Sequence, residues 1–356
     1  MITIRHRLRA GALLCVLLGA TGAALPAEAR RAPAPCASTR EPALAARLSR
    51  DITAALEGRE GTVSVAVHDP GRGLRCRLGD TRPHDSASIA KVLILQAVLG
   101  RAEELGRRPT ALESRRMKAM ITRSDNDAAG ALWQGLSRAR LARVLREAGA
   151  KDTVLGHDRY WGLTRTTARD QLALLAAVAR RPPALTLMGQ VVRSQTWGVT
   201  AGAPRTVKVH LKNGWLPRST HGWRVHSIGI ARPATAPPAG TAPATDYRMA
   251  LLSHDNTTMA YGVRTLEGVA VAVHRHLSGT TAARGRTPAS TISEHPDGSA
   301  PYGPPAPRPG PPPAPDPDPE RAPAPAPSPA PAAGPPPRTA AAPRRAPNPP
   351  RNRRSG

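Results

Sequence analysis

Residues 88–95 read SIAKVLIL, and they place a lysine inside an almost wholly apolar run. Apolar side chains continue around every side of the helix that we expect from about residue 88 to residue 105. A helix without a polar face is buried on all sides. The lysine of this run, Lys91, must then lie in or beside the centre of the protein, and a buried cation at that place needs a reason.

Lysine is rare in this chain, since only five of its 51 Lys and Arg residues are lysines. Burial and neighbouring cations lower the pKa of a lysine amine, whereas an arginine guanidinium stays protonated. Ser88 lies three residues before Lys91, so on a helix the two side chains share a face. Because a serine hydroxyl becomes a strong nucleophile when a base takes its proton, we predict that the two form a nucleophile and base pair. Free N–H groups at the start of the helix would favour an oxyanion there, and Asp85 or Ser86 could cap this helix.

The segments around this helix predict an α+β fold. Leu44, Leu48, Ile52 and Leu56 recur every four residues, as in an amphipathic helix. Residues 62–69 and 74–80 alternate as a β-hairpin, and three more strands are expected at 206–214, 222–231 and 246–255, followed by a helix at about 261–277. The result is an antiparallel five-stranded sheet flanked by helices, and the helical stretch at about 111–179 should form an all-helical lobe.

The two ends of the chain differ from its middle. Residues 1–29 have a basic start, an apolar stretch and small residues before a cleavage site, which predicts a Sec-type signal peptide and a secreted, extracellular or cell-envelope protein. The apolar stretch is shorter than the roughly 20 residues that a membrane anchor needs. Residues 280–356 hold most of the 40 prolines and should be a disordered Pro/Ala/Arg-rich tail. Residues 36–279 remain as one globular domain.

Cysteine content and charge suggest the environment of the protein. Removal of the signal peptide leaves Cys36 and Cys76, which in an oxidising compartment predict one disulfide. The formal net charge of +26 favours anionic cell-envelope polymers as partners of the basic tail, and aromatic residues at 3% argue against nucleic acid. The histidines show no metal-ligand spacing, and the pair His274 and His276 is too weak a signal to count, so we expect no metal, no cofactor and a monomer.

Two further motifs follow the serine and lysine in order. The stretch TRSDNDAAG contains Ser124, Asp125 and Asn126 at a break between helices, and HLKNGWLP ends a strand with Lys212 and Asn213. S-x-x-K, then S-D-N, then K-T-G is the signature of class A β-lactamases and penicillin-binding proteins. From about residue 36 to residue 277 the sequence resembles this superfamily of serine hydrolases. The stretches LREAGAKDTVLG and RTTARDQLALL also resemble the flanks of the class A omega loop.

The resemblance implies a role for each matching residue. Ser88 would be the acylated nucleophile, Lys91 its base, Ser124 a proton shuttle and Lys212 the cation that attracts the substrate carboxylate. Asp125 would structure its loop.

Four other residues would bind the substrate. Asn126 would hold the substrate amide, and Asn213 would contact the substrate in place of the motif's threonine. Gly214 would let the backbone come close, and the N–H of Trp215 would complete an oxyanion hole with the N–H of Ser88.

The sequence departs from the class A pattern at two places. The third motif is Lys-Asn-Gly, and the omega-loop glutamate that activates the deacylating water in class A enzymes has no counterpart. Between Ser124 and Lys212 the only glutamate is Glu147, in a helical stretch. Three aspartates could substitute, although turn or helix-surface positions suit them better: Asp152, Asp158 and Asp170.

Three functions follow from these observations. The first is a secreted β-lactamase-like serine hydrolase that forms an acyl-enzyme at Ser88 on a β-lactam or a related amide or ester. The second is a D-Ala-D-Ala-type peptidase with slow deacylation, acting on cell-wall peptides. The third is a non-catalytic protein that keeps the fold and binds the cell envelope.

Overall fold

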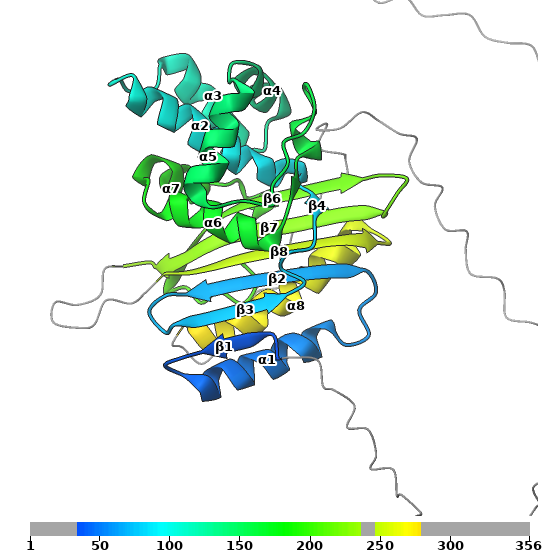
Figure 1. Ribbon diagram of the computed structural model, residues 1–356. Helices are drawn as coiled ribbons and strands as arrows, with labels where there is room; N and C mark the ends of the chain where they lie inside the picture. The colour runs from blue at the N-terminus through cyan, green and yellow to red at the C-terminus, as the bar shows by residue number, and fades with distance from the viewer. Residues whose placement is uncertain (1–33, 236–245, 279–356) are drawn as a thin grey trace, which may run out of the picture. The chain divides into compact units, whose positions relative to one another are not determined.

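A six-stranded antiparallel sheet with the strand order β1-β3-β2-β8-β7-β6 forms the middle layer of the fold (Figure 1). The structure, a computed structural model, describes residues 34–235 and 246–278. The predicted signal peptide at 1–29 and the predicted tail at 280–356 lie outside the described residues, so the limits proposed for the domain stay a prediction.

All five strands expected from the sequence are present. Their bounds are β2 (Thr62–Asp69), β3 (Leu74–Leu78), β6 (Val207–Pro217), β7 (Trp223–Pro233) and β8 (Tyr247–Asn256). The prediction of five strands was one too few, because β1 (Cys36–Ser38) adds to β3 at the edge of the sheet. Three residues are too short to show an alternating pattern. Cys36 pairs with Cys76 across the two strands, and the predicted disulfide between them is present.

Alternate residues of the strands face two different layers. On one face, Val65 and Val67 of β2 pack with helices α1 (Pro42–Leu56) and α8 (Met259–Leu277). Ala66 lies between them in sequence and joins the core on the other face. This is the period of two that β-strands impose on side chains, and it means that the sheet is buried on both sides at β2, whereas β3 exposes Arg75 and Arg77.

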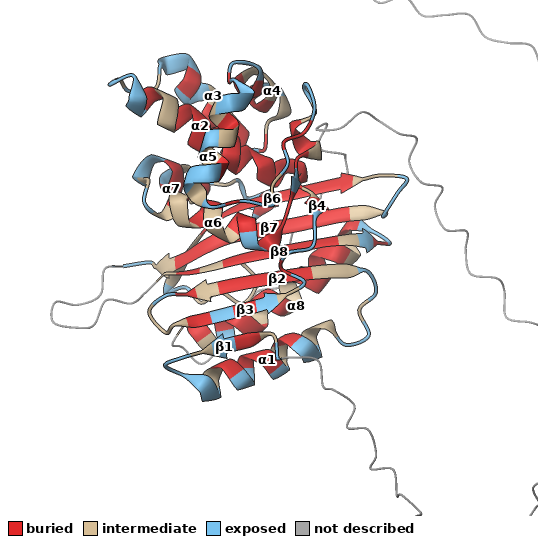
Figure 2. Ribbon diagram, viewed as in Figure 1, coloured by how far each residue is buried: buried red, intermediate tan, exposed pale blue. Residues whose placement is uncertain are grey.

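The second face of the sheet carries the helical lobe that the sequence predicted, shown above the sheet in Figure 1. Its helices are α2 (Lys91–Glu104), α3 (Ala111–Thr122), α4 (Asn126–Gln134), α5 (Arg138–Ala148), α6 (Ala168–Ala179) and α7 (Pro182–Met188). As the uniform apolar pattern predicts, α2 is buried on all sides from Lys91 to Leu99, and only its last turn reaches the surface (Figure 2). Among the described residues, no helix is long and apolar enough to cross a membrane.

Short irregular elements connect the two layers. They are the 3₁₀ turns η1 (Ala87–Ala90), η2 (Trp161–Leu163) and η3 (Arg193–Gln195), and the strands β4 (His84–Asp85) and β5 (Arg165–Thr166), which pair with each other. The pairing of β4 with β5 holds the chain in place just before η1 and α2.

The expected capping of this helix was wrong. Ser86 precedes η1 but its side chain does not cap it; its Oγ donates to the carbonyls of Ala87 (3.3 Å) and Gly162 (3.4 Å). The carboxylate of Asp85 instead forms an ion pair with Arg224 (3.1 Å). A 3₁₀ turn replaces the first turn of the predicted helix, so the geometry of an α-helical N-cap does not arise.

Candidate active site

Lys91 lies at the centre of a buried hydrogen-bond network. Its Nζ atom is 2.8 Å from Ser88 Oγ, 2.9 Å from Ser124 Oγ and 2.7 Å from Asn126 Oδ1. The carbonyl of Ser124 is also within 2.6 Å of Nζ. Both Ser88 and Lys91 are fully buried. The amine therefore has the serine hydroxyl within the reach that a general base needs.

Ser124 connects this lysine to a second one. Lys212 of β6 is also fully buried, and its Nζ donates to Ser124 Oγ at 2.8 Å and to the Asn213 carbonyl at 2.7 Å. Ser124 has a left-handed backbone, with φ of 59°. A non-glycine residue rarely adopts this conformation, which costs roughly 1–2 kcal/mol. It places the hydroxyl between the two amines, where a proton can pass.

The S-D-N loop is built by local hydrogen bonds. Asp125 is the N-cap of α4, and its carboxylate accepts from the N–H of Ala128 at 2.8 Å. A capping carboxylate satisfies one of the free N–H groups of a helix start. The contact agrees with the structuring role expected for Asp125. Asn126 is the first residue of α4, and so its amide oxygen reaches Lys91 from the end of a fixed helix.

Gly214 allows β6 to approach η1 closely. A Cβ atom at this position would lie 2.8 Å from the backbone nitrogen of Ser88 and 2.9 Å from that of Ile89. Backbone atoms cannot move aside as a flexible side chain can, so any larger residue would push the strand away from the turn. The Ser88 N–H thus lies directly beside the strand that carries Trp215, as the expected oxyanion hole requires.

The side-chain amide of Asn213 forms its hydrogen bonds inside the core. Its Nδ2 donates to the carbonyls of Gln195 (2.8 Å) and Trp197 (3.3 Å), and its Oδ1 accepts from Ser227 Oγ (2.6 Å). The side chain is 1% exposed. These contacts give Asn213 a structural role and do not support the substrate-binding role that we expected for it. Strand alternation explains this outcome, because Asn213 lies between Lys212 and Gly214 and points to the opposite face.

The segment that takes the place of the omega loop brings an aromatic ring to Lys91. The Nζ atom lies 4.7 Å from the centre of the Trp161 ring, within the range of a cation–π contact. The sequence reasoning missed this residue. The only available signal is a tryptophan, a residue that occurs five times in the chain, between the two stretches that resemble the flanks of the omega loop.

The acidic residues near the omega-loop region make other contacts or lie at the surface. Asp170 lies in the first turn of α6, whose N-cap is Thr167, and its Oδ2 accepts from the N–H of Asp152 (2.9 Å) and from Thr153 Oγ1 (2.6 Å). Burial raises the pKa of Asp170. Asp158 is exposed, and its carbonyl accepts from the indole N–H of Trp133. Glu147 is part of α5 and lines a surface pocket with α2. The positions of Asp152 and Asp158 agree with the turn positions expected for them, whereas Asp170 is buried rather than on the helix surface, because it bonds the segment before the omega-loop region. None of these residues is a counterpart of the omega-loop glutamate.

Comparisons with known proteins agree with the motifs. Residues 114–246 match the β-lactamase enzyme family (Beta-lactamase2). No curated protein matches the sequence.

Several solved structures share the fold. A β-lactamase from Xanthomonas campestris pv. campestris is 22% identical with a TM-score of 0.54, over 66% of this chain and 99% of that one. A β-lactamase from Sphaerobacter thermophilus is 16% identical with a TM-score of 0.52, over 65% and 97%. A mutant class A β-lactamase of the last common ancestor of Gram-negative bacteria is 20% identical with a TM-score of 0.54, over 65% and 99%.

The match of residues 114–246 includes Ser124, Asn126 and Lys212, while Ser88 and Lys91 precede it. The structure brings these five residues into one buried network. The chain accordingly has the class A β-lactamase fold, and its match to the β-lactamase enzyme family confirms the superfamily that the three motifs predicted.

Proposed function

We propose that this protein is a secreted serine hydrolase that acts through an acyl-enzyme at Ser88 on a β-lactam or a related amide or ester. One observation carries the proposal: the amine of Lys91 lies 2.8 Å from Ser88 Oγ inside a buried network that also contains Ser124 and Lys212. Buried lysines are costly to keep, and two of them around two serines suit acyl transfer better than a structural role.

The acylation step assigns a proton path to these residues. Ser88 Oγ attacks the carbonyl carbon of the substrate, and Lys91 takes the hydroxyl proton. The N–H groups of Ser88 and Trp215 stabilise the oxyanion. When the carbon–nitrogen bond breaks, Ser124 gives a proton to the leaving nitrogen and is reprotonated from the amines beside it. Lys212 supplies the positive charge that attracts a substrate carboxylate.

The exposure of the site residues indicates where a substrate would enter. Ser88 is fully buried, while Ser124 and Trp215 are each 8% exposed. A substrate then has to enter between the S-D-N loop and the end of β6. Asn126 lies at this entrance, half-buried, and could hold the substrate amide while its Oδ1 bonds Lys91.

A specific observation favours a second function, a D-Ala-D-Ala-type peptidase with slow deacylation. Trp161 of the omega-loop region contacts Lys91, and the sequence of that region contains no glutamate. In class A enzymes a glutamate of that region activates the water for deacylation. With an indole there, the acyl-enzyme would form and persist, so β-lactams would inhibit the protein instead of being turned over.

One experiment separates these functions. The purified protein is incubated with a chromogenic cephalosporin and with penicillin, while hydrolysis and the intact mass of the protein are followed. Fast turnover supports the β-lactamase. A long-lived adduct with slow turnover supports the peptidase. The absence of both leaves the non-catalytic envelope-binding protein and contradicts the proposed acyl transfer.

The site assignment has its own control. Ser88→Ala removes the nucleophile and should abolish any adduct, whereas Ser194→Ala, at an exposed serine of η3, should leave it unchanged. An adduct that survives Ser88→Ala would show that another residue is acylated.

Secretion and the role of the tail complete the proposal. A basic tail could attach the domain to anionic cell-envelope polymers, with β-lactams or cell-wall peptides as the small substrates of the site. N-terminal sequencing of the secreted protein tests the cleavage before Arg30, and a wall-binding assay with and without residues 280–356 tests the attachment.

A further inference from the structure

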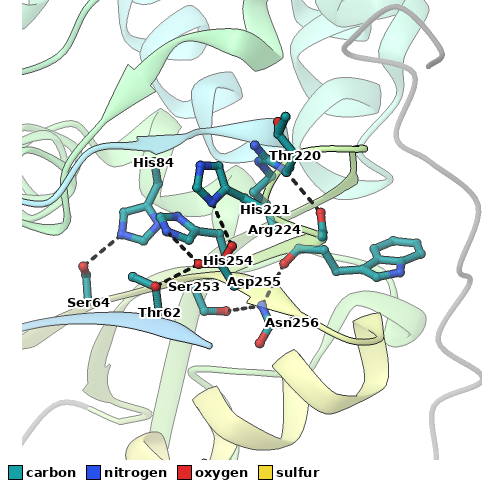
Figure 3. Close-up of polar contacts among 12 residues, drawn as sticks. Thr62, Ser64, His84, Thr220, His221, Arg224, Ser253, His254, Asp255 and Asn256 are labelled. Atoms are coloured by element: carbon teal, nitrogen blue, oxygen red, sulfur yellow. Dashed lines mark hydrogen bonds and ion pairs between the residues drawn. The ribbon is translucent and has the colours of Figure 1, made fainter. Parts of the chain in front are cut away.

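A second cluster of polar side chains lies where the turn between β6 and β7 meets the end of β8 (Figure 3). His221 belongs to the turn, and His254 and Asp255 belong to β8. Asp255 Oδ1 is 2.8 Å from His221 Nδ1, and Asp255 Oδ2 is 3.3 Å from His254 Nε2. Two imidazole rings from separate segments thus point at one carboxylate.

The backbone of this region brings the three side chains together. Residues 254 and 255 are neighbours in a strand, and their side chains would normally point to opposite faces. Asp255 has a left-handed backbone, with φ of 61°, and this breaks the alternation so that both side chains reach the same point. His221 is left-handed too, with φ of 62°, and its carbonyl accepts from the N–H of Asp255 at 2.8 Å.

Further contacts hold two of the three side chains in place. Thr62 Oγ1 of β2 donates to Asp255 Oδ2 at 2.9 Å. The ring of His254 packs on that of His84, with centroids 4.6 Å apart, and His84 Nε2 is bonded to Ser64 Oγ at 2.9 Å. Carboxylates and imidazoles that bind metals are oriented in this way by neighbouring hydrogen-bond partners and packed rings.

We propose that His221, His254 and Asp255 form a binding site for a divalent transition-metal ion of the Zn²⁺ class. Two imidazoles and one carboxylate are a ligand set that Zn²⁺ accepts, with water or an exogenous ligand in the fourth position. One ligand atom from each residue lies within 4.8 Å of the others. Ligand atoms in a tetrahedral Zn²⁺ site with bonds of about 2.0–2.1 Å are about 3.4 Å apart, so the site closes with a small movement.

His221 is the residue that can make this movement. Its side chain is 60% exposed, against 14% for His254. The ion would replace the hydrogen bond between His221 and Asp255 and the ion-pair contact between His254 and Asp255. The positive charge of Arg224 near the site would repel a cation, but this charge is partly neutralised by the ion pair of Arg224 with Asp85 at 3.1 Å. The ion would join the turn between β6 and β7 to the ends of β8 and β2.

Sequence spacing does not reveal this site. His221 is separated from His254 by the whole of β7, the connection that follows it and most of β8. Metal motifs that can be recognised in a sequence depend on ligands that are close in the chain. Here only the antiparallel pairing of β7 with β8 brings the ligands together, which is why we expected no metal from the sequence.

The test measures metal binding directly. The untagged protein, freed of metal with a chelator, is dialysed against Zn²⁺ at pH 7.5, and the bound metal is counted by atomic emission. We expect one Zn²⁺ per chain at this site. His221→Gln and Asp255→Asn should each weaken the affinity for Zn²⁺ by about tenfold or more.

His276→Gln is the matched control. His276 is also bonded to a carboxylate, that of Asp51 at 2.9 Å, but this carboxylate is shared with Arg275 at 3.0 Å. The control variant should bind Zn²⁺ as the unchanged protein does. Circular dichroism confirms that each variant is folded before it is titrated.

An NMR titration of the unchanged protein tests the same site without any variant. In two-dimensional NMR spectra, added Co²⁺ should broaden the signals of residues 219–223 and 253–256 first. Two results would overturn the proposal: no Zn²⁺ bound by the unchanged protein, which leaves only the contacts between the two histidines and Asp255, or Zn²⁺ binding that His221→Gln and Asp255→Asn leave intact.

Discussion

Lys91 differs from an arginine at the same position in one chemical property, the ability to lose its proton. Lys91→Arg would keep the charge and could still donate to Ser124 and Asn126, but it could not act as a base toward Ser88. We expect the rate of Ser88 acylation by a β-lactam to fall by about 10²–10⁴, the usual contribution of a general base. Stopped-flow or mass measurements of acylation give this rate.

Lys118→Arg serves as the control for this change. Lys118 is exposed on α3, so the same substitution there should leave both acylation and the melting temperature unchanged. Normal acylation by Lys91→Arg would contradict the assignment of Lys91 as the base.

Gly214 tests the close approach of β6 to the nucleophile. In Gly214→Ala the new Cβ would lie 2.8 Å from the nitrogen of Ser88, so strand and turn must separate. We expect a loss of about 1–3 kcal/mol in the free energy of unfolding, as for other overpacked sites, together with slower acylation. Denaturant unfolding and acylation rates measure the two effects.

Gly130→Ala is the matched control for this change. Gly130 lies in α4, and no neighbouring atom lies within 4 Å of a Cβ built there. Alanine in a helix interior is favoured over glycine by roughly 0.5–1 kcal/mol, so this variant should be as stable as the parent or more so. Equal losses in both variants would show that the contact of Gly214 with η1 is not the cause.

The regular elements of the fold could be predicted from the sequence, since each has its own local pattern. The four-residue spacing of α1, the unbroken apolar run of α2 and the alternation of β2 and β6 are such patterns. β1 and the β4–β5 pair could not be predicted, because they have two or three residues each and exist only through their partners. The order of the six strands depends in the same way on pairings distant in sequence.

Helix α8 contains a buried histidine whose titration should limit stability in acid. His274 Nδ1 is 2.6 Å from the Tyr247 hydroxyl and Nε2 is 2.8 Å from the Val199 carbonyl. Burial lowers the pKa of His274 to about 4, from 6.5. The unfolded chain therefore takes up this proton first as the pH falls. The contribution of His274 to stability is intact above about pH 6.5 and is lost progressively between 6.5 and 4.

The size of this effect follows from the difference of about 2.5 pKa units, which corresponds to about 3 kcal/mol at 1.36 kcal/mol per unit. His274→Gln offers a donor and an acceptor but does not titrate. The difference in unfolding free energy between the parent and this variant should shrink as the pH falls from 7 to 4.5. A constant difference for His274→Gln would contradict the buried, neutral state of His274.

At the scale of the whole molecule, the disulfide and the candidate site lie on opposite edges of the sheet. Cys36 and Cys76 join β1 to β3, and β6 is the strand at the other edge. The bridge closes a separation of 40 residues, and loss of such a native disulfide usually costs about 2–5 kcal/mol. The double variant Cys36→Ala and Cys76→Ala should lose stability of this order yet acylate Ser88 at the parental rate, well below its melting temperature.

Thermal unfolding and acylation assays on the same samples check both parts. The parent protein under mild reduction should reproduce the loss of stability. A variant that keeps full stability but loses acylation would reveal a long-range link between the two edges that the strand order does not suggest.

Part of the candidate site could be predicted from the sequence, and the part that could not depends on the fold of the whole molecule. Ser88 and Lys91 belong to one short run, so local chemistry identified them, and the order of the motifs located Ser124 and Lys212. The environment of each residue was not predictable. The bonds of Asn213 to the segment before β6 depend on which way the strand faces, and the contact of Trp161 with Lys91 depends on how β4 pairs with β5.

The indole of Trp161 beside Lys91 gives the protein an internal optical signal. Indole fluorescence responds to a charge a few ångströms away, and the Lys91 amine lies 4.7 Å from the ring centre. Each change in the protonation of that amine should alter the emission of Trp161. The difference between the emission of the parent and that of Trp161→Phe would then report the proton transfers that accompany the reaction of Ser88 in real time. The compounds tested would need neither a label nor a chromophore.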